Sequence, residues 1–240
     1  MTKRILFIVE GKKTEPRFIK KMMSTLGLAE EKEIYSFGTN IHVLYDKVFG
    51  NADPEEVDLL LSLKSIADDE GKQILSQSYT DVYLVFDVEV HDPRFNPDHI
   101  SELLNHFYDS TEEGKLYLNY PMMESYRHMR SLPDPDYLGS VIRLEDIPHY
   151  KRIVGDECCD ELRDPNSIDG LKMREIALAN AKKYLLLVTG NADSIDSYTV
   201  CDGRMVFSIQ MARLKDKEEL FIVNTSVLIF VDLNPRCFFS

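Results

Sequence analysis

Two carboxylates stand at the ends of apolar runs that are typical of buried strands. Glu10 closes the run at residues 5–10 (ILFIVE), and Asp87 closes the run at residues 82–87 (VYLVFD), with Glu89 two positions later. Continuous apolar runs are typical of parallel sheets, in which ligands bind beyond the carboxyl ends of the strands. We therefore expect Glu10 and Asp87 to meet in one crevice at the edge of a parallel sheet.

Carboxylates held at close range favour a divalent cation, because they cannot all stay ionised and unpaired. In an extended segment, residues i and i+2 share a face, so that Asp87 and Glu89 can bind the same ion. Asp92 adds a further carboxylate, although Asp92-Pro93 is also common in turns. We predict Glu10, Asp87 and Glu89 as catalytic metal ligands, Asp92 as a supplementary ligand, and Mg²⁺ as the ion, with Mn²⁺ able to substitute.

Basic residues surround the first of these acids. Residues 1–21 contain seven Lys or Arg against two Glu, a local net charge of +5, whereas the whole chain of 240 residues has a net charge of −13. The global acidity argues against a protein that coats nucleic acid by electrostatics alone. The local cluster predicts that Lys12, Lys13 and Arg17 bind a substrate phosphate; a solvated helix face is the alternative.

The hydrophobic pattern predicts an α/β sandwich with a mainly parallel sheet. Strands are expected at residues 5–10, 33–37, 82–87 and 115–120. Helices are expected from 14, 41, 53, 98 and 121 onward. Beyond a soft boundary at residue 135, strand signals fade and helices are expected near 141–147, 148–162 and 170–187, while 220–230 reads as a buried helix or strand. We thus divide the chain into a catalytic domain (1–135) and a mostly helical accessory domain (136–240).

Several classes of protein are disfavoured by the sequence. The residues GKKT at 11–14 lack the spacing of a nucleotide-binding P-loop, and no G-x-G-x-x-G is present. The four cysteines form no C-x-x-C pair, which is typical of reduced thiols rather than a zinc site. No apolar run approaches the roughly 20 residues of a membrane helix, and the apolar stretch at the start is too short for a signal peptide. We expect no membrane contact and a cytoplasmic location.

The order strand–Glu–Gly-x-x-Thr-Glu–helix, then strand–Asp-x-Glu, resembles the Toprim domain of topoisomerases, primases and certain nucleases. The segment VEGKKTEP at 9–16 is close to the form found in anti-phage Toprim nucleases of the RloB-like and OLD-like type and in the Toprim effector of the PARIS system. The segment NYPMME at 119–124 is similar to a later Asn-Pro and helical Glu of these relatives, with one residue inserted. Glu89 stands where the family usually has Asp. The resemblance covers about residues 4–130.

This resemblance implies a Toprim-like Rossmannoid sandwich and a metal-dependent nuclease that cleaves RNA such as tRNA, or DNA, as a toxin-like effector of anti-phage defence and abortive infection. It also implies Glu124 as a further metal ligand. Two alternatives stay open: a catalytically weak Toprim-like module that acts through a protein partner such as an ATPase, and a phosphohydrolase of small nucleotides. A homodimer is also left open.

Two histidines and three tyrosines lie near these motifs. His91 and His128 could move a proton or orient a phosphate, although isolated histidines are more often incidental. Tyr117, Tyr120 and Tyr126 could stack on bases, but packing in the core is favoured.

Overall fold

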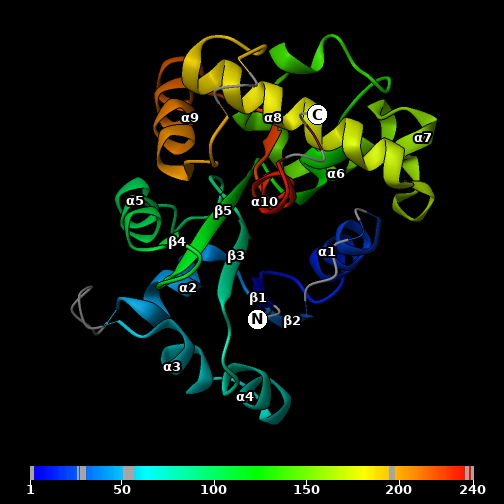
Figure 1. Cartoon of the computed structure of the whole chain (residues 1–240). Helices are drawn as coiled ribbons and strands as arrows, with labels where there is room; N and C mark the ends of the chain where they lie inside the picture. The colour runs from blue at the N-terminus through cyan, green and yellow to red at the C-terminus, as the bar shows by residue number, and fades with distance from the viewer. Residues whose placement is uncertain are drawn as a thin grey trace.

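The apolar runs that end in acid form neighbouring strands of a central, mostly parallel β-sheet in the computed structural model of the protein (Figure 1). The structure describes residues 3–25, 27, 31–50, 57–194, 198–235 and 238. Helices lie on both sides of the sheet, so the prediction of an α/β protein with a mainly parallel sheet is confirmed. Within the described residues, no helix combines the length and the apolar character needed to cross a bilayer.

The central sheet follows the order β2-β1-β3-β5, and these four strands are parallel to one another. Two short strands, β4 and β8, pair with β5 in antiparallel fashion, and β6 pairs with β7 in a separate small sheet. The strands are β1 (Arg4–Val9), β2 (Glu31–Ser36), β3 (Asp81–Asp87), β4 (Tyr108–Asp109), β5 (Gly114–Tyr120), β6 (Val141–Arg143), β7 (Glu219–Phe221) and β8 (Val223–Asn224).

Several helices begin at a residue whose side chain caps the first turn. The side chain of Asn40 accepts from the backbone N–H of Val43 at the start of α2, and Asp169 caps α8 in the same way. The α-helices are α1 (Thr14–Thr25), α2 (Ile41–Val48), α3 (Leu59–Lys64), α4 (Asp69–Leu75), α5 (Pro97–His106), α6 (Tyr150–Glu157), α7 (Asp160–Arg163), α8 (Gly170–Thr189), α9 (Gly203–Lys217) and α10 (Leu228–Leu233). The described residues also form the 3₁₀ helices η2 (Met123–Arg127), η3 (Tyr137–Gly139), η4 (Leu144–His149) and η5 (Pro165–Ser167).

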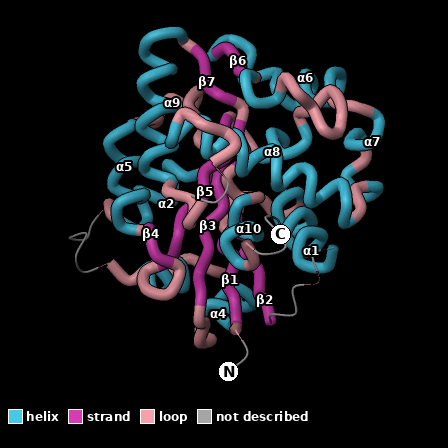
Figure 2. The backbone as a smooth tube through the Cα atoms, turned by 45° about the horizontal axis from the view of Figure 1, so that its top comes forward, coloured by secondary structure: helices cyan, strands magenta, loops and turns pink. Residues whose placement is uncertain are grey.

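Aromatic side chains fill the core on both faces of the sheet. On one face, Phe7 of β1 stacks on Tyr83 of β3 and on Phe230 of α10, with ring centroids 5.6 and 6.5 Å apart. On the other face, Phe86 contacts Phe37, with ring centroids 6.1 Å apart. Figure 2 shows α10 lying over the sheet beside α1, and rings of these two helices are in contact. This two-sided burial explains why β1 and β3 are apolar without alternation.

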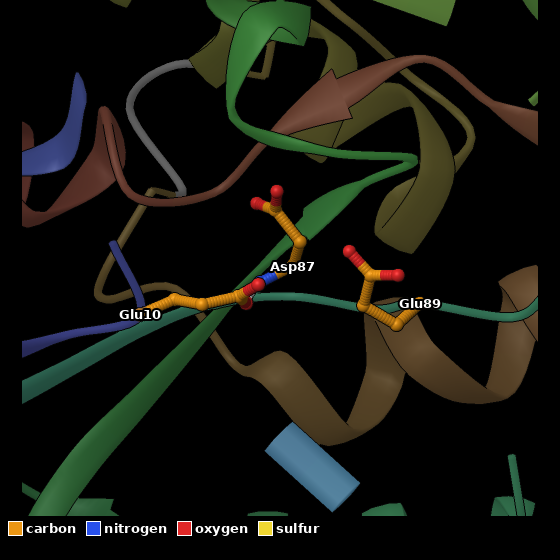
Figure 3. A group of neighbouring side chains, drawn as sticks. All are labelled: Glu10, Asp87 and Glu89. Carbon is orange, nitrogen blue, oxygen red and sulfur yellow. Dashed lines mark hydrogen bonds between the residues drawn. The ribbon is translucent and has the colours of Figure 1, made fainter. Parts of the chain in front are cut away.

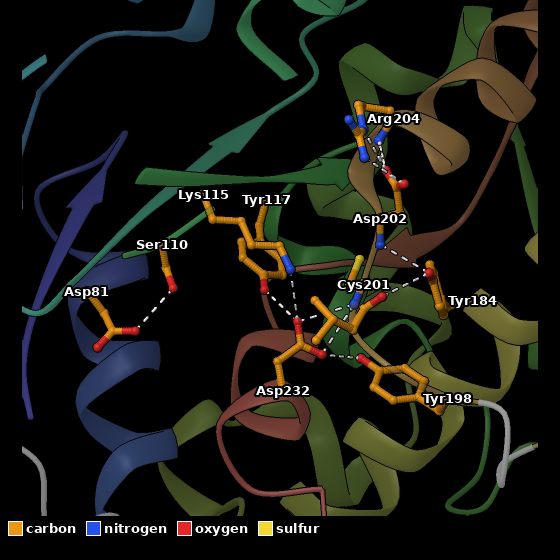
Figure 4. Close-up of polar contacts among 11 residues, drawn as sticks. Asp81, Ser110, Lys115, Tyr117, Tyr184, Tyr198, Cys201, Asp202, Arg204 and Asp232 are labelled. Atoms are coloured by element: carbon orange, nitrogen blue, oxygen red, sulfur yellow. Dashed lines mark hydrogen bonds and ion pairs between the residues drawn. The ribbon is translucent and has the colours of Figure 1, made fainter. Parts of the chain in front are cut away.

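The last part of the chain completes the sheet that the first part begins. Asn224 of β8 pairs with Asn119 of β5, and Phe230 packs on Phe7. Asp232 of α10 accepts hydrogen bonds from the hydroxyls of Tyr117 and Tyr198, each at 2.6 Å (Figure 4). Residues on both sides of position 135 therefore share one continuous core, and the division into two domains at that position stays a prediction from composition.

Four local predictions require correction or fall outside the structure. Residues 141–143, expected in a helix, form β6, because they pair with β7 near the other end of the accessory part. The segment after Pro121 forms the short 3₁₀ helix η2 rather than an α-helix. The helix that the sequence predicts over about 98–110 is α5, and it ends at His106 because residues 108 and 109 pair with β5 as β4. The helix start expected at Asp53-Pro54 lies outside the described residues, and α3 begins at Leu59.

Candidate metal centre

Glu10 and Asp87 lie side by side at the carboxyl ends of β1 and β3. The backbone N–H of Asp87 donates to Oε2 of Glu10 at 3.1 Å, and the N–H of Glu10 donates to the carbonyl of Val85 at 3.2 Å. The chain leaves β1 toward β2 on one side of it and returns as β3 on the other side. Such a reversal of strand order is where open α/β sheets form their ligand crevice.

Glu89 joins these two acids through a turn rather than through an extended strand. Strand β3 ends at Asp87, and Glu89 has a φ of 50°, in the left-handed region that side chains other than glycine rarely adopt. One carboxylate oxygen from each of Glu10, Asp87 and Glu89 lies within 4.8 Å of the others, a spacing that could hold a metal ion (Figure 3). Asp87 and Glu89 do come together as expected, but the reason differs. The backbone turns at Glu89 instead of continuing as an extended strand. A left-handed non-glycine residue costs about 1–3 kcal/mol, which the surrounding contacts must offset.

Residues at the start of α2, together with Arg94, hold this turn in place. The buried His42 donates from Nε2 to the carbonyl of Glu89 at 3.3 Å. Asn40 donates to Oδ2 of Asp92 at 2.8 Å, and Arg94 donates to the same oxygen at 2.7 Å. The hydrogen bond from Arg94 is the main reason why the pKa of Asp92 is lowered. The structure therefore does not bring Asp92 into the acid cluster, since its carboxylate already bonds Asn40 and Arg94 and fastens the loop instead.

Burial and mutual repulsion make the carboxylates of the cluster hard to ionise without a cation. Burial raises the pKa of Glu10 to about 8, opposed in part by the hydrogen bond from the Asp87 backbone, and nearby Glu89 adds to the rise. Burial also raises the pKa of Asp87 well above its usual range, with Glu10 as the next cause. Asn119 donates to Oδ1 of Asp87 at 3.2 Å, and Ser226 orients Asn119 by donating to its Oδ1 at 2.7 Å. An all-carboxylate donor set that resists ionisation fits a hard divalent cation such as Mg²⁺ or Mn²⁺.

An open cavity of about 780 Å³ lies over the three acids. Lys12 and Lys13 line it from the loop between β1 and α1, and Lys151 and Arg152 line it from α6. The side chains of Lys12 and Lys13 form no ion pair with any carboxylate in the described part of the chain. The cavity thus combines an acidic floor with basic walls. The sequence motifs did not point to Lys151 or Arg152, because residues so far along the chain reach the site only through the tertiary fold.

Two more glutamates are buried next to the cluster. Glu15 lies in the first turn of α1 over Gly11, where a Cβ atom would stand 2.5 Å from Oε2 of Glu15. Burial raises the pKa of Glu15. Glu124 forms an ion pair with Lys151 through Oε1 at 3.5 Å, and its Oε2 is buried without a hydrogen-bond partner among the described residues. Glu124 is close enough to help raise the pKa of Asp87, but it is not one of the three residues grouped around the candidate ion position.

The remaining predicted residues divide between this cavity and other places. His91 lines the cavity, with its Nε2 3.4 Å from Glu89 Oε2. His128 does not line this cavity and contacts the hydroxyl of Tyr150 at 3.0 Å, and Arg17 lines a second cavity. Tyr117 and Tyr120 are 1 % exposed and Tyr126 is 4 % exposed, so all three belong to the core, as the packing alternative predicted.

Comparisons with known proteins leave the family open. No protein-family model, no curated protein and no solved structure matches this chain. The fold and site define an α/β protein with an acidic cluster at the carboxyl edge of a parallel sheet, and the Toprim resemblance stays a prediction from the motifs.

Proposed function

We propose that this protein is a metal-dependent nuclease, in which Glu10, Asp87 and Glu89 hold Mg²⁺ or Mn²⁺ and the substrate is a phosphodiester of nucleic acid. The observation that carries the proposal is the convergence of three acids from two strand ends, 77 residues apart along the chain, within 4.8 Å of one another. Carboxylates gathered at such an edge serve phosphoryl chemistry well, since they bind the hard cation that this chemistry uses.

The residues of the site have distinct tasks in this proposal. Glu10, Asp87 and Glu89 would hold the cation, which would supply activation of a water molecule and neutralise negative charge on the phosphate. Burial raises the pKa of Glu10 to about 8 in the metal-free site, so a cation that bound its carboxylate near neutral pH would displace a proton from it. Lys12 and Lys13 have no carboxylate partner in the described structure and line the same cavity, so they are placed to bind phosphate oxygens of the substrate.

The motifs of the first 130 residues extend the proposal to its biological setting. Their similarity to anti-phage Toprim nucleases supports a Toprim-like effector that cleaves RNA such as tRNA, or DNA, during phage defence. In this proposal, Glu124 does not bind the cation directly. Together with Lys151, its ion-pair partner, it adjusts the charge around Asp87.

A cleavage assay tests the proposal. The purified protein is incubated with tRNA, plasmid DNA and free nucleotides, each with Mg²⁺, with Mn²⁺ or with EDTA. We expect polymer cleavage that requires the metal and falls on the order of 100-fold or more in Asp87→Asn. Glu112→Gln is the control, because Glu112 is exposed in the turn before β5, at the opposite end of the strands.

Two outcomes would replace the proposal. Turnover of free nucleotides without polymer cleavage would assign a phosphohydrolase of small nucleotides. The absence of any turnover, together with stoichiometric binding of a purified ATPase partner, would assign a binding module.

A further inference from the structure

A second cavity, of about 360 Å³, adjoins the acidic one. Lys13 and Thr14 line both cavities, so the two meet at the start of α1. The walls of the second cavity come from α1, from η2 and from the residues at the start of η5. It contains none of the three clustered acids, and it holds the predicted phosphate-binding residue Arg17 that the first cavity lacks.

The charge of this second cavity is opposite to that of the whole protein. Four basic side chains line it, Lys13, Arg17, Lys21 and Arg127, against the single carboxylate of Glu124, whereas the chain has a net charge of −13. Glu124 is itself engaged by Lys151 of the first cavity. The cavity therefore concentrates positive charge in an acidic protein, which indicates an anionic ligand.

The basic side chains are set in a row along α1. The backbone N–H of Arg17 donates to the carbonyl of Lys13 at 3.2 Å, so Lys13 continues the helical register. Lys13, Arg17 and Lys21 are then spaced at i, i+4 and i+8, with a rise of about 6 Å for each step. Arg17 is exposed and forms no ion pair with a described carboxylate. A row of cations leading out of the first cavity matches a chain of phosphates better than a single phosphate.

The opposite wall fixes a fourth cation above buried aromatic rings. Arg127 donates to the carbonyl oxygens of Leu162 and Arg163 at 3.5 and 3.3 Å, which holds its guanidinium without neutralising it. Phe18 and Tyr126 are buried at the base of this cavity, with ring centroids 4.8 Å apart, so they pack on each other and leave no open ring face for a base. The cavity therefore attracts a ligand through its cations, as a chain of phosphates requires.

We propose that the second cavity binds the nucleotides that flank the scissile phosphate, so that the substrate is a polynucleotide strand running from the acid cluster along α1. This assignment rests on the proposed nuclease function for the direction of the strand, but the binding itself does not require cleavage. It also separates the roles of neighbouring cations: Lys12 serves the scissile phosphate, and Arg17 serves a phosphate further along the strand.

Binding is measured by fluorescence anisotropy with labelled single-stranded RNA and DNA of about 12 nucleotides, in EDTA so that no cleavage occurs. We expect Arg17→Ala to weaken binding roughly tenfold and to lower the slope of log K against log salt by about 0.7, the value for one lost phosphate contact on a single strand. The matched control is Arg143→Ala, an exposed arginine on β6 that pairs with Glu145 outside both cavities. A slope and affinity unchanged in Arg17→Ala, or equally changed in Arg143→Ala, would overturn the proposal.

Cleavage gives a second readout with Mg²⁺ present. Arg17→Ala should lower kcat/KM more for the oligonucleotide than for a dinucleotide, which is too short to reach the second cavity. An equal loss on both substrates would place Arg17 at the scissile phosphate and refute the assignment. If the wild-type protein cleaves nothing, the nuclease proposal fails, while the anisotropy and its salt slope still decide whether this cavity binds a strand.

Discussion

The raised pKa of Glu10 adds a pH-dependent contribution to the stability of the metal-free protein, and a single substitution removes that contribution. The pKa of Glu10 rises from 4.5 in the unfolded chain to about 8 in the folded protein, mainly because of burial. The folded state then binds the proton more tightly than the unfolded state. The stability linked to this proton is fully present below pH 4.5 and is lost as the pH rises through 8.

The magnitude follows from the linkage relation. One proton changes the free energy of unfolding by about 1.4 kcal/mol per pH unit inside this window, so Glu10 costs at most about 3 kcal/mol between pH 5 and 7, and less where solvent screens its partly exposed carboxylate. Glu10→Gln cannot ionise, yet its amide oxygen can still accept the backbone N–H of Asp87. In EDTA, the variant should therefore become more stable than the wild type as the pH rises from 5 to 8.

The assay is urea denaturation at several pH values, in EDTA and again with MgCl₂. Because a cation binds the ionised cluster, Mg²⁺ should stabilise the wild type more at pH 8 than at pH 5, and should stabilise Glu10→Gln much less. Glu112→Gln, with the same change at an exposed site, should follow the wild type throughout. Parallel curves for the wild type and Glu10→Gln from pH 5 to 8 would refute the view that burial holds the proton on Glu10.

Three further substitutions test the contacts around the cluster and the packing of the core. Asn119→Ala removes the donor to Asp87 and should lower Mn²⁺ affinity by about 10- to 100-fold in calorimetry, and an unchanged affinity would contradict its role. His42→Leu removes the bond to the Glu89 carbonyl and should lower cleavage by roughly tenfold or more with little loss of stability; equal cleavage would show that the turn holds without it. Phe230→Ala should lower the free energy of unfolding by about 3–5 kcal/mol in urea, since its ring is fully buried, and a loss under about 1 kcal/mol would be inconsistent with the packing.

The position of Glu10 beside Asp87 was accessible from the sequence because it depends on local pattern. Residues 5–9 and 82–86 are buried on both faces and read as unbroken apolar runs, and each ends at an acid. The parallel arrangement then places both ends at one edge. What the pattern could not give is the backbone turn at Glu89, since a left-handed glutamate is set by contacts with α2 rather than by its own preference.

Other features depend on distant contacts that leave no local signal. The carboxylate of Asp92, predicted as a supplementary ligand, accepts hydrogen bonds from Asn40, 52 residues earlier, as well as from Arg94. Helix α9 was not anticipated, because Met205 is exposed while Gln210 is buried, where it exchanges two hydrogen bonds with the backbone of Phe221. An exposed apolar residue and a buried polar one weaken the hydrophobic pattern expected of a helix. The burial of Gln210 is explained only by its bonds to β7.

The bond from Ser226 to Asn119 has a consequence for how the protein is made. These residues are 107 positions apart, and Asn119 in turn contacts Asp87. At about 5–20 residues per second, the ribosome needs roughly 5–20 s to travel between them. During that interval the nascent chain carries all three clustered acids but not the serine that steadies their neighbour. The hydrogen bond that orients Asn119 beside Asp87 can therefore form only after Ser226 has been added to the chain.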